Sequence, residues 1–271
     1  MEITVDGVSL SVQDEGVGEP VLLLHGFPDS SQLWRHQVGP LVRAGRRVIV
    51  PDLRGFGASD RPADVAAYRL AVVLRDVVAV LDRAGVGRAD VVGHDMGADL
   101  GWVLAATMPE RVRRLAVLSV GHPAAFFTAG MRQREKSWYL LYFQFQGAAE
   151  QGLTRDGWRL FRQWLAGAVD TERYVRDLSR PGALTAALNW YRADSPVAGF
   201  AGQPRSLPPV RCPTLGIWGT QDFALTEEQM TGSAAHVQGQ WRYERIDGAG
   251  HWLPLDAPDQ VTGLLLEHLQ R

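Results

Sequence analysis

Residues 89–104 read Ala-Asp-Val-Val-Gly-His-Asp-Met-Gly-Ala-Asp-Leu-Gly-Trp-Val-Leu, and this stretch decides the fold. Its apolar first part predicts a buried strand, and its second part has the spacing of a helix. A strand that turns sharply into a helix needs small residues on both sides of the apex, because the two backbones nearly touch. Gly93 and Gly97 supply them around Asp95. The pattern is typical of a nucleophile elbow, in which the central side chain, usually Ser, projects from the carboxyl end of a sheet.

The overall composition is that of an ordinary globular protein. The chain has 271 residues, of which 46% are apolar and 21% are charged, and its net charge is −2. This charge gives no reason to expect a nucleic acid or an anionic membrane as a partner. Cys212 is the single cysteine, so no internal disulfide can form. Neither a signal-like N-terminal segment nor a membrane-spanning apolar run is present in the sequence. We therefore expect a cytoplasmic protein.

Apolar strands alternate with amphipathic helices on both sides of the opening stretch. We expect a hairpin over 2–12 and buried strands near 21–24, 48–50, 89–92, 115–118, 214–218 and 241–246. We expect helices over 31–43, 70–81, 97–108, 226–236 and 258–269. This alternation implies a mostly parallel sheet covered on both faces.

The alternation stops after residue 123. Residues 124–209 contain helical, aromatic-rich segments and no convincing strand, and the proline-rich part at 194–209 is expected to be a linker. We therefore predict an α/β core formed by 1–123 and 210–271, with a helical cap inserted at 124–209.

Two polar residues follow the later strands of the predicted sheet. Asp222 comes after the strand at 214–218, and His251 comes after the last strand, within Gly-Ala-Gly-His-Trp. Because the carboxyl ends of parallel strands lie at one edge of an open sheet, both side chains are expected near Asp95. The chain order of nucleophile, acid and histidine predicts a catalytic triad.

Four motifs together resemble the α/β-hydrolase family over essentially the whole chain. In chain order they are His25-Gly26-Phe27-Pro28, Arg54-Gly55-Phe56-Gly57-Ala58-Ser59, Gly93-His94-Asp95-Met96-Gly97 and Gly250-His251-Trp252. The resemblance implies an α/β-hydrolase fold, with a mostly parallel sheet flanked by helices and an inserted helical cap. It also implies that the backbone N–H groups of Phe27 and Met96 form an oxyanion hole. We assign no chemistry to the loop from Arg54 to Ser59.

Aspartate at the apex of the elbow changes the expected reaction. A serine that attacked a saturated carbon would form an ether, which the enzyme could not cleave. A carboxylate forms an alkyl ester instead, and water activated by His251 can hydrolyse that ester at its carbonyl carbon. Asp95 therefore indicates displacement at saturated carbon, as in epoxide hydrolases and dehalogenases, rather than esterase chemistry.

The leaving group distinguishes these two subfamilies. The alkoxide of an epoxide needs a proton donor, which tyrosine can supply. Two aromatic segments of the predicted cap resemble those that supply paired tyrosines in epoxide hydrolases. This resemblance assigns the pair to Tyr139 and Tyr191, with Tyr142 as the alternative in the first segment. Dehalogenases commonly have Trp at the position of Met96, and so do many epoxide hydrolases. The substrate preference therefore stays open.

The sequence therefore predicts an epoxide hydrolase that forms a vicinal diol through a covalent ester on Asp95. Trp138, Trp190 and Phe223 are expected to make the substrate site apolar, so the expected partners are a small apolar epoxide and water. No metal and no cofactor are expected, and a homodimer is left open. The alternatives are a haloalkane or haloacetate dehalogenase and a non-catalytic ligand receptor on the same scaffold.

Overall fold

A mostly parallel sheet forms the centre of the protein. A computed structural model describes residues 1–165, 167–194 and 206–270. Within this part of the chain the sheet has eight strands in the order β1-β2-β4-β3-β5-β6-β7-β8. The strands are β1 (Glu2–Val5), β2 (Val8–Glu15), β3 (Glu19–Leu24), β4 (Arg46–Pro51), β5 (Ala89–His94), β6 (Val112–Leu118), β7 (Thr214–Gly219) and β8 (Trp241–Ile246).

The direction of the strands confirms the predicted architecture. β1 and β2 form the predicted hairpin, and β2 also pairs antiparallel with β4. From β4 to β8 every neighbouring pair is parallel. Because parallel strands end at the same edge, the loops that follow β3, β5, β7 and β8 meet there.

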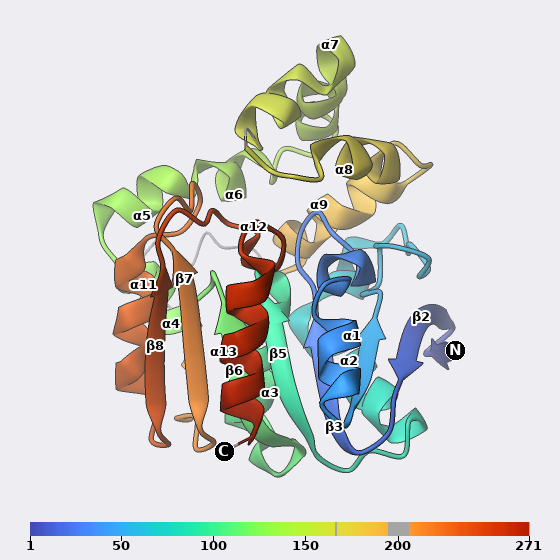
Figure 1. Ribbon diagram of the computed structural model, residues 1–271. Coiled ribbons are helices and arrows are strands. Elements are labelled where there is room, and N and C mark those ends of the chain that lie inside the picture. The colour runs from blue at the N-terminus through green and yellow to red at the C-terminus, as the bar shows by residue number, and fades with distance from the viewer. Residues whose placement is uncertain (166, 195–205, 271) are drawn as a thin grey trace.

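Helices cover both faces of the sheet (Figure 1). α1 (Val38–Arg43) and α13 (Pro258–Gln270) pack together on one face, and α2 (Leu70–Arg83) and α3 (Met96–Thr107) pack together on the other. The short helices α11 (Glu227–Thr231), η4 (Gly232–His236) and α12 (Leu253–Asp256) complete the C-terminal part, and η2 (Val65–Tyr68) and η3 (Pro109–Arg111) lie before and after the α2–α3 pair. No helix in the described residues combines the length and apolarity needed to cross a bilayer.

The spacing of apolar residues explains these faces. In α2 the residues at helical spacing are buried, and the helix ends one residue before Ala84-Gly85, where Gly85 has a φ of +69°. Every residue of β5 is buried, as expected for a central strand covered on both faces. Full burial of one aliphatic side chain stabilises a fold by about 1.5–3 kcal/mol. Burial of these side chains therefore stabilises the central sheet, which carries the loops at its carboxyl edge.

The prediction of one helix over 31–43 is wrong in its middle. A 3₁₀ helix, η1, covers Ser31–Trp34, and α1 begins only at Val38. Pro40 explains the break, because proline has no N–H and its ring would collide with the carbonyl of His36 in a continuous helix. Because α1 begins at Val38, Pro40 falls in its first turn, where proline is tolerated.

Between β6 and β7 the regular elements of the described residues are helices, apart from one isolated β-bridge between Val210 and Val237. These helices are α4 (Pro123–Thr128), α5 (Met131–Lys136), α6 (Trp138–Tyr142), α7 (Ala148–Trp164), α8 (Thr171–Leu178) and α9 (Ala183–Ala193). α7 has non-helical backbone at Arg155, Asp156, Gly157 and Trp158. α7 and α8 lie above the carboxyl edge of the sheet, at the top of Figure 1. The linker predicted at 194–209 falls mainly on 195–205, outside the described residues.

Candidate active site

Asp95 lies at the turn between β5 and α3. Its backbone has φ 53° and ψ −120°, a conformation that residues other than glycine rarely adopt. A Cβ atom at Gly93 would overlap the carbonyl of Gly97, and one at Gly97 would overlap the carbonyl of Leu24. The two glycines therefore permit the tight turn that projects the Asp95 side chain at the carboxyl edge of the sheet.

Backbone donors hold the carboxylate of Asp95. The N–H of Phe27 donates to Oδ1 at 2.8 Å, and the N–H of Met96 also bonds the carboxyl group. Gly26 allows this approach, because a Cβ there would overlap the Asp95 side chain. Burial acts to raise the pKa of Asp95, but hydrogen bonding and charge from His251, together with the Met96 N–H, lower it below its ordinary value. The carboxylate is therefore ionised at neutral pH.

His251 lies between two carboxylates. Its Nδ1 is 2.9 Å from Oδ2 of Asp222, and its Nε2 is 3.6 Å from Oδ2 of Asp95. Burial lowers the pKa of His251, but the two carboxylates outweigh burial and raise this pKa to about 10. The imidazole is therefore protonated at neutral pH while Asp95 carries its negative charge.

The turn after β7 holds Asp222 in place. Its Oδ1 accepts the N–H groups of Ala224 at 2.8 Å and Leu225 at 2.9 Å, which leaves Oδ2 for His251. The ammonium group of Lys136, on α5, donates to the Asp222 carbonyl at 2.6 Å. The acid therefore has one orientation, with one oxygen on the backbone and the other on the imidazole.

Two further side chains fix the backbone of His251. Ser119 Oγ donates to its carbonyl at 2.7 Å, and His94 Nε2 lies 2.9 Å from the same oxygen. Burial, followed by the positive charge of His251, lowers the pKa of His94 to about 4. His94 is therefore neutral and can donate its Nε2 proton to this carbonyl. Both residues position His251.

Tyr139 on α6 and Tyr191 on α9 face each other. Their ring centroids are 6.0 Å apart and their planes are nearly perpendicular, at 89°. Burial, and after it the charge of Asp95, raises the pKa of both phenols well above the ordinary value. Both hydroxyls therefore keep their protons. Tyr142 turns toward α7, where a Cβ at Gly152 would overlap its hydroxyl. The structure thus brings Tyr139, and not Tyr142, beside Tyr191.

A series of aromatic rings connects the tyrosines with His251. The ring centroid of Trp164, at the end of α7, lies 5.0 Å from that of Tyr139 and 5.8 Å from that of Phe223. Phe223 in turn lies 5.8 Å from the His251 ring, as its predicted place in the site requires. Sequence reasoning did not single out Trp164, whose only signal is its presence in an aromatic-rich helical segment.

Of the two tryptophans expected in the substrate site, Trp190 lies elsewhere, and Trp138 lies at the edge of the aromatic rings, with its centroid 6.2 Å from that of Trp164. Trp190 donates from Nε1 to the carbonyl of Arg54 at 2.9 Å, and its ring lies 6.0 Å from that of Phe56, in a core loop. Trp138 leaves 42% of its surface exposed and packs against Tyr142 at 5.7 Å. Neighbouring residues of a helix point about 100° apart. Trp190 therefore faces away when Tyr191 faces the site, and Trp138 is likewise turned from Tyr139.

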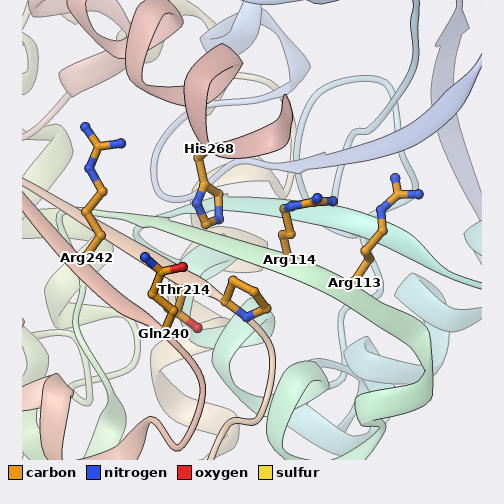
Figure 2. A pocket seen from close by; sticks show the side chains of 7 residues that line it. Arg113, Arg114, Thr214, Gln240, Arg242 and His268 are labelled. Atoms are coloured by element: carbon orange, nitrogen blue, oxygen red, sulfur yellow. The ribbon is translucent and has the colours of Figure 1, made fainter. Parts of the chain in front are cut away.

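A pocket lies at the amino end of β6, β7 and β8, opposite the edge that carries Asp95 and His251 (Figure 2). It is lined by Arg113, Arg114, Pro213, Thr214, Gln240, Arg242 and His268. Its arginines are already paired, Arg113 with Asp90 at 2.8 Å and Arg242 with Glu244 at 2.7 Å. Because these arginines are already paired, the pocket is not an open anion site. It also lies at the opposite end of the strands from the triad. Across the described ranges, His, Cys, Asp and Glu side chains form no group that could hold a metal ion.

Residues 19–258 match the family model described as alpha/beta hydrolase fold. The chain belongs to the α/β-hydrolase family. This α/β hydrolase is 34% identical to "Epoxide hydrolase A" of Mycobacterium tuberculosis, over 98% of this chain and 96% of that protein. It is 33% identical to "AB hydrolase superfamily protein YfhM" of Bacillus subtilis, over 99% and 96%.

A solved structure extends the likeness to the whole fold. The epoxide hydrolase of Bacillus megaterium, in complex with an inhibitor, matches with a TM-score of 0.90 and 27% identity, and the match covers 100% of both chains. The resemblance drawn from the four motifs is thereby confirmed, and the relatives of this α/β hydrolase include proteins named epoxide hydrolases.

Proposed function

We propose that this α/β hydrolase converts an epoxide to a vicinal diol through a covalent ester on Asp95. One observation carries the proposal: Tyr139 and Tyr191 lie with their ring centroids 6.0 Å apart, near enough to the elbow carboxylate of Asp95 for its charge to raise the pKa of both phenols. Such a pair can protonate the poor alkoxide leaving group of an epoxide. The relatives named as epoxide hydrolases support the same reaction.

In the first step Asp95 is the nucleophile. Because Oδ1 accepts the Phe27 N–H, Oδ2 is the oxygen left to attack an oxirane carbon. The bond between that carbon and the ring oxygen breaks, and its electron pair goes to the oxygen, which takes a proton from Tyr139 or Tyr191. The products are an alkyl ester on Asp95, a free hydroxyl group and a tyrosinate.

In the second step His251 is the base. Ester formation removes the charge of Asp95, which is one of the two carboxylates that raise the pKa of His251. The pKa falls, and the proton that the imidazole releases balances the one that the tyrosine donated. Neutral His251 then takes a proton from water, which attacks the carbonyl carbon of the ester. The N–H groups of Phe27 and Met96 stabilise the oxyanion. Its collapse breaks the bond between the carbonyl carbon and the ester oxygen, and protonated His251 gives its proton to the departing alkoxide, which leaves as the diol.

The helical segment supplies the apolar part of the proposed site. We take residues 124–209 as the cap inserted between β6 and β7, supported by the helices α4–α9 in its described part. Trp164 from this segment and Phe223 from the core place aromatic rings between the tyrosines and His251. An apolar wall of this kind fits an aliphatic or aromatic epoxide. With Cys212 as its single cysteine, the chain has no internal disulfide to maintain, and we propose the cytoplasm as its compartment.

A single-turnover reaction in ¹⁸O-labelled water tests the proposal. With enzyme in excess over styrene oxide, the label should enter the Asp95 carboxylate, and the first diol should carry unlabelled oxygen from Asp95. The double variant Tyr139→Phe/Tyr191→Phe should lose turnover, whereas Tyr142→Phe, the matched control, should keep it. Label that enters the diol directly would rule out the ester. Halide release from haloalkanes, with no turnover in an epoxide panel, would establish the dehalogenase alternative.

A further inference from the structure

A buried carboxylate lies on the loop that carries the oxyanion donor Phe27. Asp29 has only 2% of its surface exposed, and its N–H donates to the carbonyl of Gly26 at 2.9 Å. Its carboxylate accepts three donors: the Ser30 N–H at 2.7 Å, Arg173 Nη2 at 2.8 Å and the Tyr174 hydroxyl at 2.8 Å. The positive charge that compensates the buried carboxylate of Asp29 therefore comes from Arg173 on helix α8.

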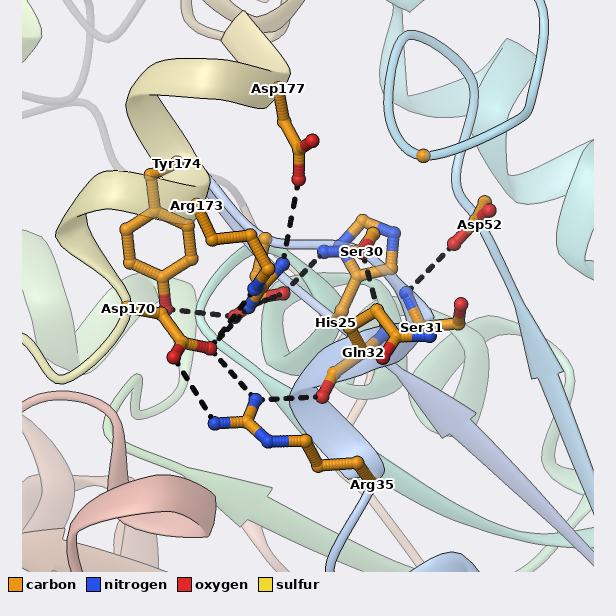
Figure 3. Close-up of polar contacts among 12 residues, drawn as sticks. His25, Ser30, Ser31, Gln32, Arg35, Asp52, Asp170, Arg173, Tyr174 and Asp177 are labelled. Carbon is orange, nitrogen blue, oxygen red and sulfur yellow. Dashed lines mark hydrogen bonds and ion pairs between the residues drawn. The ribbon is translucent and has the colours of Figure 1, made fainter.

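Arg173 belongs to a chain of charges, Asp29–Arg173–Asp170–Arg35, that joins α8 to the core at both of its ends (Figure 3). Its Nη2 lies 2.8 Å from Asp29 and 2.7 Å from Asp170 Oδ2. Asp170 also binds Arg35, which follows η1 in the core, at 2.8 Å. The Arg173 side chain is 16% exposed, whereas that of Arg35 is 32% exposed. The two crossings thus differ: one ends on the exposed surface and the other on the buried oxyanion loop.

The inner crossing approaches the triad from two directions. Through Asp29 it reaches the loop whose Phe27 N–H donates to Asp95 at 2.8 Å. Through Tyr174 it reaches Trp252, at 5.7 Å between ring centroids, and the Trp252 ring lies 5.1 Å from that of His251. These neighbours connect Arg173 with the groups around Asp95 and His251.

We propose that Arg173 is a positioning residue for the hydrolytic step, which keeps the Phe27 N–H directed at Asp95 by holding Asp29. The inference rests on the proposed function and assigns the role to a cap residue outside the triad and the tyrosine pair. Loss of Arg173 leaves Asp29 buried without a cation, so the loop must move to hydrate or protonate it. Displacement of a catalytic donor by about 1 Å can slow a reaction roughly 100-fold.

Rapid-mixing kinetics on full-length variants separate the two half-reactions. Arg173→Met should slow ester hydrolysis by about 100-fold, with a much smaller effect on ester formation, because only hydrolysis builds an oxyanion. Arg35→Met is the matched control: it breaks the outer crossing, leaves Asp29 paired, and should keep both rates. Arg173→Lys should restore part of the hydrolysis rate. If Arg173→Met does not fold, Tyr174→Phe removes one donor to Asp29 and should shift hydrolysis in the same direction.

Hydrogen exchange at the Phe27 amide gives a readout that does not need substrate. Arg173→Met should lose protection there, and Arg35→Met should retain it. Equal slowing of both half-reactions, or equal effects of the two variants, would reduce Arg173 to an anchor of α8 and overturn the inference. A wild-type protein that turns over no epoxide would overturn the proposed function instead, and the amide exchange would still decide the role of Arg173.

Discussion

Neutralising Asp95 tests how the site moves its protons. His251 Nε2 lies 3.6 Å from Asp95 Oδ2, and the pKa of His251 is raised to about 10 by Asp222 and Asp95 against the effect of burial. At an effective dielectric constant of about 20, two unit charges at this separation interact by roughly 4.6 kcal/mol, or about 3 pKa units. The variant Asp95→Asn keeps the shape of the side chain and removes its charge. We expect the pKa of His251 to fall from about 10 to about 7.

NMR titration of the His251 ring measures this shift directly. Wild type and Asp95→Asn are compared over the same pH range, with Asp82→Asn as a charge control, because Asp82 is exposed and pairs with Arg111. His251 in Asp82→Asn should titrate like His251 in the wild type. If His251 in Asp95→Asn still titrates near the wild-type value, Asp222 alone sets the pKa, and the charge of Asp95 does not govern the base.

The covalent ester removes the same charge, so it should reproduce the shift during turnover. Only neutral His251 can accept a proton from water, and it is protonated below its pKa. The rate of ester hydrolysis should therefore rise with pH through about 7 and level off above about pH 8. A rate that still rises about tenfold from roughly pH 8 to pH 9 would show that the pKa stays high in the ester.

Three further substitutions probe the supports of the site. Trp164→Ala removes the ring between Tyr139 and Phe223, so kcat/KM for bulky epoxides relative to small ones should rise about tenfold or more in competition assays. Arg54→Met leaves the buried partner Asp76 unpaired and should cost about 3–5 kcal/mol in urea unfolding, with recovery in Arg54→Met/Asp76→Leu. Gln133→Leu removes the amide that binds the Thr226 N–H at 2.8 Å and the Ala224 carbonyl at 2.9 Å, and should lower stability by about 1–3 kcal/mol and kcat together.

The proposed triad of Asp95, Asp222 and His251 could be predicted because its geometry follows from local patterns. Each member stands in the loop that follows a strand, and parallel strands bring their carboxyl ends to one edge whatever the loops between them do. Asp222 and His251 are 29 residues apart in the chain, yet the structure places them 2.9 Å apart. The elbow needed even less, since Gly93 and Gly97 report the tight turn within a few residues of Asp95.

The remaining parts of the site depend on tertiary packing that leaves no periodic signal. Asp29 reads as a loop residue, and only the fold shows that Arg173, 144 positions later, neutralises it. Trp164 likewise gives no periodic signal, and only the fold shows that its ring lies between those of Tyr139 and Phe223. Trp190 shows the opposite error, because a motif that identifies Tyr191 does not state which way its neighbour on the helix points. Likewise, the sequence of the loop from Arg54 to Ser59 does not indicate the buried ion pair that Arg54 forms with Asp76.

The division of roles between the two parts of the chain has a physical consequence. Asp95 and His251, the proposed nucleophile and base, stand on loops of the sheet, whereas the proposed proton donors, Tyr139 and Tyr191, stand on the helices α6 and α9. Ring opening needs both at once, because the alkoxide must be protonated as Asp95 attacks. The seating of these helices on the core therefore sets the reaction geometry. Since α8 is tied to the Phe27 loop through Arg173 and Asp29, displacement of these helices would remove the proposed proton donors and disturb the proposed oxyanion hole together.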